Sequence, residues 1–380
     1  MNKHSIMIAG AGGIGHAAAV ILSNYKAEDL DIFIGDRFLE NAEKSASEIN
    51  SKTGRSVCSP FLFPEEGEND DLSKFLERTD VILDCLPGSQ APRLAELAKK
   101  YNCHYANLTE YVRETDMVTE IAESCDTGFV LQTGLAPGYI NVLANHLFQR
   151  FTEKYKVDKV DTIEMKVGAL SKHAPEPYFY AYTWSPIGVA TEYVKQAIVV
   201  DDYETKYIPS LSKTEMILID GVAYEDDYTS GGAADLPKAL AGKTKNLRYK
   251  TLRYPGHYKW VRSVLKETPE GEDKVAFLNR TMQSQIPAVE DDVVVVFASV
   301  KGQDSGGQLR SLEKSIFVNP SKINGIKLRA IQTTTAAPLC QMALMLLENK
   351  LKGPVFQSQI PALEFLNGEI VSSVFGEIDE

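Results

Sequence analysis

Ile6-Met7-Ile8-Ala9-Gly10-Ala11-Gly12-Gly13-Ile14-Gly15, residues 6–15, is the stretch that decides the fold of this chain. Its glycines at 10, 12 and 15 have the spacing Gly-x-Gly-x-x-Gly, with an apolar strand before them and an alanine-rich helix after them. In this pattern the first glycine permits a tight turn, the second lets backbone approach a pyrophosphate, and the third lets helix and strand pack closely. A plain glycine-rich turn is the alternative interpretation.

The next predicted strand, residues 30–35, ends at an acidic residue. Asp36 lies 21 positions after Gly15 and is followed by Arg37. A carboxylate at this place accepts hydrogen bonds from the adenosine ribose hydroxyls and repels a 2′-phosphate, whereas an arginine attracts one. We therefore expect NAD as the cofactor, with NADP less favoured. The predicted contacts at this end are Gly10, Gly12, Gly13, Ile14, Gly15, Asp36 and Arg37.

The composition indicates a soluble globular protein of 380 residues, with 44% hydrophobic and 24% charged residues. A net charge of −12 without a basic tract speaks against a nucleic-acid partner. Cysteines at 58, 85, 103, 125 and 340 show no Cys-x-x-Cys spacing, so we expect reduced thiols and a cytoplasmic location. Glycines interrupt the apolar N-terminus, and no run of about 20 apolar residues follows, so we expect no membrane segment.

Strand and helix patterns alternate through the first 135 residues, which predicts a parallel sheet with helices on both faces. We expect strands at 5–10, 30–35, 57–62, 80–85, 103–108 and 128–133, and helices at 13–25, 37–52, 72–78, 90–101 and 114–125. Ligands of such sheets lie beyond the carboxyl ends of the strands. The predicted cofactor contacts therefore extend to Cys85, Leu86, Pro87, Asn107, Leu108 and Gly134, although 86–88 also fits a simple turn.

The pattern changes after a helix that is predicted to begin near Pro137 and to end near residue 150. Polar and apolar residues alternate at 162–167, and 293–297 with 309–318 fit a hairpin, as in a largely antiparallel sheet. An apolar helix is predicted over 337–351. The predicted domains are a Rossmann domain at 1–135, a mixed α+β catalytic and oligomerisation domain at 136–335, and a C-terminal segment at 336–380 that returns to the first domain.

Beyond the glycine loop, five blocks occur in a recognisable order: Gly134-Leu-Ala-Pro-Gly138, Tyr182-Thr-Trp-Ser-Pro186, Glu192-Tyr193, Thr229-Ser-Gly-Gly232 and Tyr249-Lys-Thr-Leu-Arg-Tyr-Pro-Gly-His257. The series resembles the saccharopine dehydrogenase-like family, which contains saccharopine reductases, carboxynorspermidine dehydrogenases and lysine 6-dehydrogenases. Ala136 and Asp36 are most similar to the lysine 6-dehydrogenase branch. The resemblance implies a homo-oligomer, expected to be a dimer, and hydride transfer at a C–N bond of an amino-acid or polyamine-type substrate.

That chemistry requires a carboxylate anchor and a group that accepts the ammonium proton. Arginine suits the first task and histidine the second. We therefore expect Arg253 as anchor and His257 as proton acceptor or orienter, with Tyr254 between them in the catalytic set. The expected substrate contacts are Trp184, Ser185, Thr229, Ser230 and Lys250, and no metal is expected because His4, His16, His104, His146 and His173 lack ligand spacing.

Structural alternatives accompany these assignments. Arg253 also fits a surface ion pair, His257 a cap of a helix beginning near Tyr258, and Ser185 an N-cap before Pro186. The favoured function is oxidative deamination of lysine or a related amine with NAD. The alternatives are a reductive condensation of the saccharopine or carboxynorspermidine type, for which Lys250 or Arg248 offers a second cationic anchor, and a non-catalytic NAD-binding regulatory protein.

Overall fold

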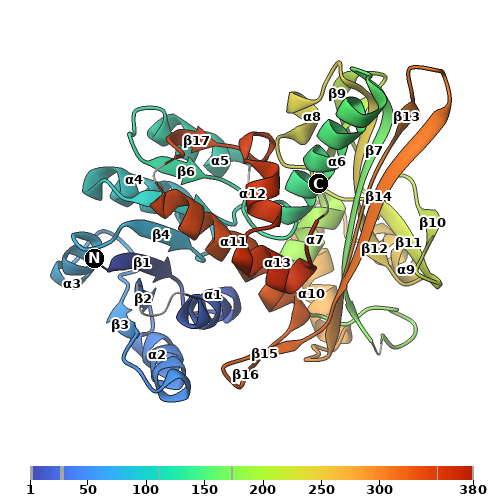
Figure 1. Ribbon diagram of the computed structural model, residues 1–380. Helices are drawn as coiled ribbons and strands as arrows, with labels where there is room; N and C mark the ends of the chain where they lie inside the picture. The colour runs from blue at the N-terminus through green and yellow to red at the C-terminus, as the bar shows by residue number, and fades with distance from the viewer. Residues whose placement is uncertain (1–2, 26–29, 111, 173, 349, 379–380) are drawn as a thin grey trace. The chain divides into compact units, whose positions relative to one another are not determined.

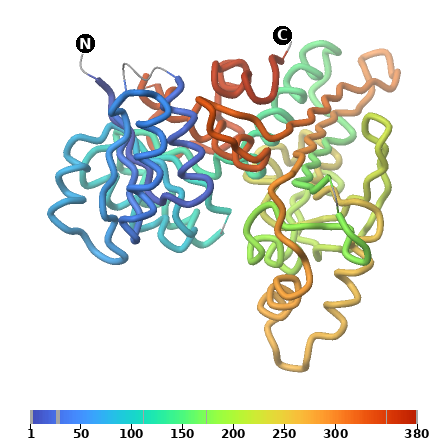
Figure 2. The backbone as a smooth tube through the Cα atoms, turned by 90° about the horizontal axis from the view of Figure 1, so that it is seen from below, coloured from blue at the N-terminus to red at the C-terminus, as the bar shows by residue number. Residues whose placement is uncertain are grey.

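The computed structural model describes residues 3–25, 30–110, 112–172, 174–348 and 350–378. Their Cα positions divide into two compact units (Figures 1 and 2). Unit 1 comprises 1–139, 321–328 and 332–380, and unit 2 comprises 140–320 and 329–331. The C-terminal segment, red in Figure 2, thus belongs to the unit that contains the first strands.

Unit 1 is built on a seven-stranded parallel sheet in the order β17-β6-β5-β4-β1-β2-β3. The two halves of this sheet meet between β1 and β4, and the connection from β3 to β4 crosses from one half to the other. This is the strand order of a Rossmann domain with one added strand. The predicted parallel sheet is therefore confirmed. Its strands are β1 (His4–Ala9), β2 (Leu30–Asp36), β3 (Cys58–Leu62), β4 (Val81–Asp84), β5 (His104–Asn107), β6 (Gly128–Val130) and β17 (Gly353–Val355).

Helices cover both faces of this sheet (Figure 1). Met7, Ile82 and Phe129 pack on one side against α3, α4 and α5. On the other side α11 contacts α1, where the Cys340 thiol meets the Ala18 carbonyl. The helices of unit 1 are α1 (Gly13–Asn24), α2 (Leu39–Thr53), α3 (Asp70–Leu76), α4 (Ala91–Tyr101), α5 (Val112–Ala122), α12 (Ala362–Leu366), α13 (Glu369–Phe375) and most of α11 (Ala330–Leu347). Unit 1 also contains a short hairpin, β15 (Ser321–Ile323) with β16 (Ile326–Leu328), and two 3-10 turns, Gly88–Gln90 and Gln357–Gln359.

Unit 2 contains an eight-stranded, largely antiparallel sheet, as predicted. Its main order is β10-β11-β12-β7-β13-β14, with the β8–β9 hairpin added through β12, and only β12 and β7 run parallel. The strands are β7 (Val160–Ser171), β8 (Ala197–Asp201), β9 (Glu204–Ile208), β10 (Glu215–Ile219), β11 (Val222–Tyr228), β12 (Thr244–Arg253), β13 (Asp292–Gln303) and β14 (Leu309–Val318). The helices are α6 (Tyr139–Tyr155), α7 (Pro186–Val194), α8 (Leu236–Ala239), α9 (His257–Lys266) and α10 (Lys274–Gln285).

Strand alternation gives β12 two different faces. Tyr249, Thr251 and Arg253 point to the side of α7 and α9, where Tyr258 of α9 donates a hydrogen bond to the Thr251 carbonyl. Lys250 and Leu252 point to the opposite side, in register with Tyr228 and Asp226 of β11. This division separates residues that lie close together in the sequence.

For two helices the structure shows why the predicted start differs from the observed one. The helix predicted from Pro137 begins at Tyr139, because Gly134 to Gly138 forms a closed turn in which Gly134 N–H donates to the Pro137 carbonyl. The helix predicted at 337–351 spans Ala330–Leu347. It begins earlier because the Asp292 carboxylate accepts hydrogen bonds from the N–H groups of Ala330 and Ile331. Helix α11 is long and apolar enough to cross a membrane, but 78% of that window is buried inside the protein, as in a core helix.

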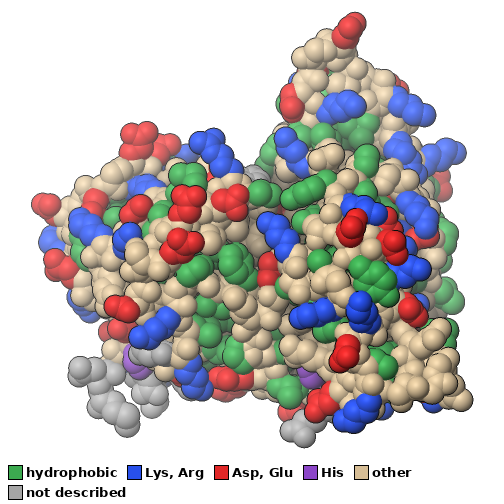
Figure 3. Space-filling model, turned by 90° about the horizontal axis from the view of Figure 1, so that it is seen from above, with side chains coloured by type: hydrophobic (Ala, Val, Ile, Leu, Met, Phe, Trp, Pro, Cys, Tyr) green, Lys and Arg blue, Asp and Glu red, His purple; other side chains and the backbone are tan. Residues whose placement is uncertain are grey.

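Acidic and basic side chains are interspersed over the face of the molecule in Figure 3. The described residues on this face form no continuous basic patch.

Candidate functional site

The glycine loop has the geometry that a dinucleotide requires. Gly10 adopts a φ of +103°, and a Cβ there would lie 2.9 Å from the Cys85 carbonyl oxygen. A Cβ on Gly15 would lie 1.8 Å from the Gly10 carbonyl oxygen, so α1 could not approach the strand. Gly12 caps α1, and a Cβ added to it meets no atom within 4 Å. The backbone therefore faces open space at a helix N-terminus, which fits a pyrophosphate.

Asp36 is fixed beside this loop. Its carboxylate accepts hydrogen bonds from the N–H groups of Ala11 and Phe38, at 2.9 and 3.0 Å, and from the Asn41 side chain at 3.2 Å. These donors hold the carboxylate where an adenosine ribose would bind. Arg37 is exposed, lies over the Phe38 ring and pairs with Glu65 at 3.6 Å, so its guanidinium is directed to neighbouring side chains.

The turns after β4 and β5 lie at the same edge as the glycine loop. Cys85 N–H donates to the Ala9 carbonyl at 2.9 Å, which places Cys85, Leu86 and Pro87 beside Gly10. Asn107 is buried at the end of β5, and Gly134 packs against Leu108. The structure thus brings together the predicted cofactor contacts of unit 1.

Two further residues at this edge escaped the sequence analysis. Glu110 follows β5 by three positions and is partly buried, and loss of solvent raises the pKa of its carboxyl to about 7. Gln332, near the start of α11, donates from its amide to the Gly13 carbonyl at 3.0 Å. The signal for Glu110 was its place just beyond a strand end, whereas Gln332 lies 319 residues from its partner and gave no local signal.

In unit 2, Arg253 and His257 belong to one buried hydrogen-bonded chain. His257 Nδ1 lies 2.8 Å from the Tyr178 carbonyl oxygen, so Nδ1 carries the proton and Nε2 accepts. The Tyr193 hydroxyl then donates to His257 Nε2 at 2.9 Å and itself accepts from Arg253 Nε at 2.6 Å. Burial, and next the Arg253 guanidinium, lower the pKa of His257 to about 3. His257 is therefore neutral, and both of its ring nitrogens are engaged.

The Arg253 guanidinium lies in an aromatic cage. It is 1% exposed and sits over the rings of Tyr180 and Tyr193, at 4.8 and 5.6 Å. Its Nη1 donates to the Leu252 carbonyl, whereas its buried Nη2 has no hydrogen-bond partner among the described residues. Trp184 packs against the same aromatic cluster. The buried Glu192 carboxylate acts electrostatically on this guanidinium, and the free Nη2 donor could in addition bind an anionic ligand.

Glu225 determines where His257 lies. Its carboxylate accepts hydrogen bonds from the N–H groups of Gly256 and Tyr258, at 3.0 and 2.6 Å, and so caps α9 from the neighbouring strand. Gly256 is the N-cap residue, with a φ of +109°. His257 is the first residue of the helix rather than its cap, which removes the structural alternative given above for this histidine.

The remaining predicted substrate contacts have internal partners. Ser185 Oγ accepts from Gly188 N–H at 3.4 Å and caps α7, as its structural alternative describes. The hydroxyls of Thr229 and Thr251 are 2.7 Å apart, and Ser230 N–H donates to the Glu192 carbonyl.

Lys250 and Tyr254 lie on the other face of the sheet from Arg253. Lys250 Nζ bonds to Asp226 at 2.6 Å, to Glu215 at 2.7 Å and to the Lys213 carbonyl at 3.1 Å, which uses all three of its N–H groups. Tyr254 stacks on Tyr224 at 5.9 Å. These two residues are therefore not brought together with Arg253 and His257.

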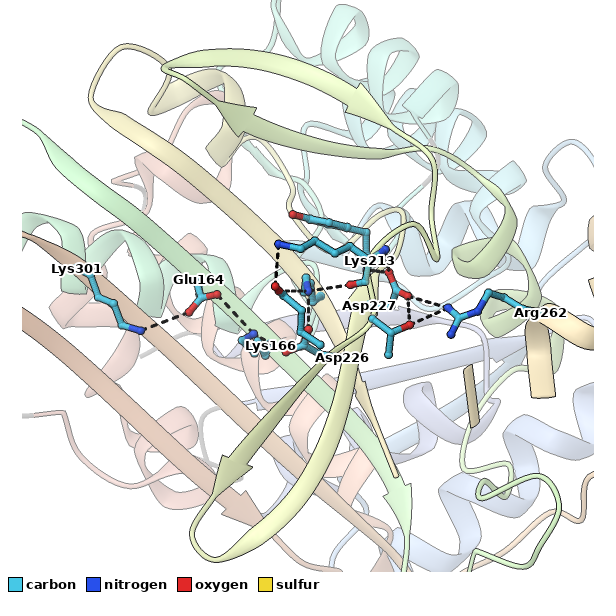
Figure 4. Close-up of polar contacts among 11 residues, drawn as sticks. Glu164, Lys166, Lys213, Asp226, Asp227, Arg262 and Lys301 are labelled. Atoms are coloured by element: carbon cyan, nitrogen blue, oxygen red, sulfur yellow. Dashed lines mark hydrogen bonds and ion pairs between the residues drawn. The ribbon is translucent and has the colours of Figure 1, made fainter. Parts of the chain in front are cut away.

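Figure 4 shows ion pairs in this part of the sheet, with Lys166, Asp226, Asp227 and Arg262 among the labelled residues. Asp226 lies between Lys250 and Lys166, the latter at 2.5 Å, while Asp227 points to the opposite face and pairs with Arg262 at 3.1 Å. Three consecutive acidic residues, Glu225 to Asp227, thus have partners on alternating faces of β11.

Within the described ranges, no group of three or more His, Cys, Asp and Glu side chains is arranged to hold a metal ion. His173 lies outside these ranges. His16 instead contacts the Ser45 hydroxyl at 3.1 Å, and burial lowers its pKa.

Comparison with known proteins gives matches along residues 6–371. The family model of the saccharopine dehydrogenase NADP binding domain matches residues 6–133, and that of the saccharopine dehydrogenase C-terminal domain matches 134–371. The alpha-aminoadipic semialdehyde synthase of Arabidopsis thaliana is 22% identical over 255 residues. That match covers 62% of this chain but only 22% of the plant protein, so the chain spans about a fifth of the length of this relative.

Two solved structures share the fold. Saccharopine dehydrogenase (L-Glu forming) from Saccharomyces cerevisiae has a TM-score of 0.74 at 14% identity, with 98% of each chain covered. The homospermidine synthase of Legionella pneumophila, solved with NAD, has a TM-score of 0.67 at 13% identity, with 99% of this chain and 90% of that chain covered.

Proposed function

The chain belongs to the saccharopine dehydrogenase family, and from that premise we propose that it is an NAD(P)-dependent oxidoreductase that deaminates lysine or a related amino-acid amine oxidatively. Two observations, each made within a single unit, support this proposal. Unit 1 has a dinucleotide loop with Glu110 at the same sheet edge, and unit 2 has the buried Arg253 with a free donor.

NAD is the proposed cofactor. The Asp36 carboxylate is held by Ala11 and Asn41 in the position where it accepts from ribose hydroxyls and repels a 2′-phosphate. Bound NAD would supply the hydride acceptor for the substrate carbon. The loop backbone binds the pyrophosphate through the N-terminus of α1.

Glu110 is the proposed proton acceptor. A carboxyl with a pKa of about 7 is ionised at mildly alkaline pH and takes the ammonium proton efficiently. His257 has no free nitrogen and a pKa of about 3, which supports the orienting role among the two that the sequence left open. It fixes Tyr193, and Tyr193 fixes Arg253.

Arg253 is the proposed anchor of the substrate carboxylate, since its Nη2 offers a charge-assisted hydrogen bond. A reductive condensation that joins two acids needs a second cationic anchor. Lys250 has all its donors engaged, and by strand parity both Lys250 and Arg248 lie on the other face of the sheet from Arg253, so the observations favour deamination of one amino acid over condensation. A dimer and a cytoplasmic location remain part of the proposal.

The test measures formation of reduced nicotinamide by absorbance with NAD and a panel of amino-acid amines. Wild-type activity with lysine or a close analogue is expected, and Glu110→Gln should lower kcat by about 10²–10⁴-fold. Glu120→Gln, an exposed residue on α5, is the matched control and should leave kcat unchanged.

Arg253→Lys should raise KM for the amine by about tenfold or more, because it loses the planar donor geometry. Absence of turnover across the panel would contradict the proposal, and unaltered kcat in Glu110→Gln would remove Glu110 from it.

A further inference from the structure

The carboxyl end of β4 holds a buried carboxylate that the proposed reaction does not use. Asp84 is 3% exposed and lies in register between Ala9 of β1 and Asn107 of β5, in the middle of the unit 1 sheet. Among the described residues it forms no ion pair with a lysine, arginine or histidine. Burial of an ionised carboxylate without a cationic partner costs free energy, so such a residue is a candidate for a functional role.

Hydrogen bonds connect this carboxylate to the turns that follow the strands. Asp84 accepts from Leu86 N–H at 3.0 Å and from the Tyr105 hydroxyl at 2.7 Å. Tyr105 in turn accepts from the Asn107 amide at 3.4 Å, and Asn107 Oδ1 accepts from Gln132 N–H at 2.9 Å. One chain of hydrogen bonds therefore spans the turns after β4, β5 and β6.

The turn after β4 also contacts the glycine loop, because the carbonyl oxygen of Cys85 lies close to Gly10. In a sheet of this topology, the backbone beyond the central strands contacts the nicotinamide half of the cofactor, whereas the loop and Asp36 contact the adenosine half. The Asp84 chain consequently supports one half of the ligand only.

Ionised Asp84 lowers the stability of the protein. Burial raises its pKa from 3.8 to about 6, against the hydrogen bonds from Tyr105 and Leu86, which lower it. Because the folded pKa is the higher one, stability declines as pH rises through this interval and stays lower at neutral pH. A group with this cost is expected where it serves binding rather than folding.

We propose that Asp84 is a positioning residue: in its ionised form it holds Leu86 and Tyr105 so that the turn at 85–87 binds the nicotinamide half of the cofactor. Protonation changes this arrangement. The acid form donates a hydrogen to the Tyr105 oxygen, and the Tyr105 hydroxyl then turns to the Ala91 carbonyl, which lies 3.4 Å away. The inference rests on the proposed dinucleotide function.

The groups that act electrostatically on Asp84 or on its neighbour do not titrate in the same range. Burial raises the pKa values of Tyr105 and of the Cys85 thiol above their usual values, and it does the same for Cys340 of α11, which interacts with Cys85. Glu110 titrates near 7, and the Glu110→Gln variant distinguishes its effect on binding from that of Asp84.

The experiment compares two ligands by calorimetry from pH 5 to pH 8: NADH, and ADP-ribose, which lacks the nicotinamide. For the wild type, the dissociation constant of NADH should rise as pH falls through about 6, while that of ADP-ribose stays constant. Asp84→Asn should raise the dissociation constant of NADH by about tenfold at pH 8 and remove its dependence on pH, and the dissociation constant of ADP-ribose should not change. Tyr105→Phe should weaken NADH in the same way.

Asp80→Asn is the matched control, since Asp80 accepts a hydrogen bond from Ser5 N–H at the opposite end of β4. It should bind both ligands as the wild type does, and Glu110→Gln should keep the pH step of NADH binding. If the wild type binds neither ligand, the proposed function fails. If it binds both without a pH step, or if Asp84→Asn weakens both equally, the positioning role is overturned, whatever the stability of the variants.

Discussion

At the scale of single residues, His257 shows how burial changes a side chain's chemistry. The sequence places a histidine four positions after an arginine, which is a pattern that favours acid–base catalysis. The structure gives that histidine two hydrogen-bond partners and a pKa of about 3. Glu110, which the sequence analysis passed over, has the pKa that a proton acceptor needs. Burial decides both cases, and local sequence does not reveal it.

Replacement of His257 should reveal this neutral state through the pH dependence of stability. His257→Gln is expected to lower the free energy of unfolding by about 1–3 kcal/mol at pH 8, because Tyr193 and the Tyr178 carbonyl lose a partner. The folded pKa lies below the unfolded one, so wild-type stability falls as pH decreases from about 6.5 toward 3.

The difference between variant and wild type should therefore shrink by about 1.4 kcal/mol per pH unit below 6.5. Urea titrations at pH 8, 6 and 5 measure it. A constant difference across these pH values would show that His257 titrates in the folded protein as it does in the unfolded chain, which would contradict the lowered pKa.

At the scale of secondary structure, a predicted helix boundary was wrong where the residue that sets it lies far away in the sequence. The strand and helix periodicities located the elements of the first 135 residues, and the glycine spacing located the glycine loop, whereas β15, β16, β17, α12 and α13 of unit 1 were not predicted. The start of α11 depends on Asp292, 38 residues before Ala330, and no local pattern contains that information. The sequence alone could, however, have predicted that Lys250 and Arg253 lie on different faces, because odd and even positions of one strand point to opposite sides of the sheet.

Asp292→Ala should release the first turn of α11. Two N–H groups, of Ala330 and Ile331, would lose their acceptor, and we expect a loss of about 1–3 kcal/mol in the free energy of unfolding. Urea denaturation followed by circular dichroism measures it, with Asp291→Ala as the neighbouring control on the exposed side. Equal losses in both variants would assign the effect to strand β13 instead of the cap.

At the scale of the whole molecule, the chain does not fold as consecutive segments. Unit 1 takes residues from both ends of the sequence: β17 pairs with β6, and Gln357 donates to the Leu131 carbonyl at 2.7 Å. The Leu346 side chain packs close to Gly128. The N-terminal half thus has the dinucleotide motif but lacks part of the core that supports it.

A fragment of residues 1–139 is therefore expected to lack a cooperative thermal transition and to bind no NADH. Addition of residues 332–380 through a flexible linker should restore both, because α11 and β17 complete the sheet and its cover. Calorimetric unfolding and NADH titration measure these properties. Full NADH affinity in the short fragment would mean that the C-terminal segment is dispensable for this unit.

The acidic run Glu225-Asp226-Asp227 sets a limit on how this protein can diverge. Glu225 and Asp227 serve one side of β11 and Asp226 the other, so each carboxylate depends on the parity of its position. Loss or gain of a single residue in that strand would move these side chains to the opposite faces of the sheet. Each carboxylate would then lie on the side away from its present partners. Substitutions are open to evolution along β11, whereas changes in its length are closed.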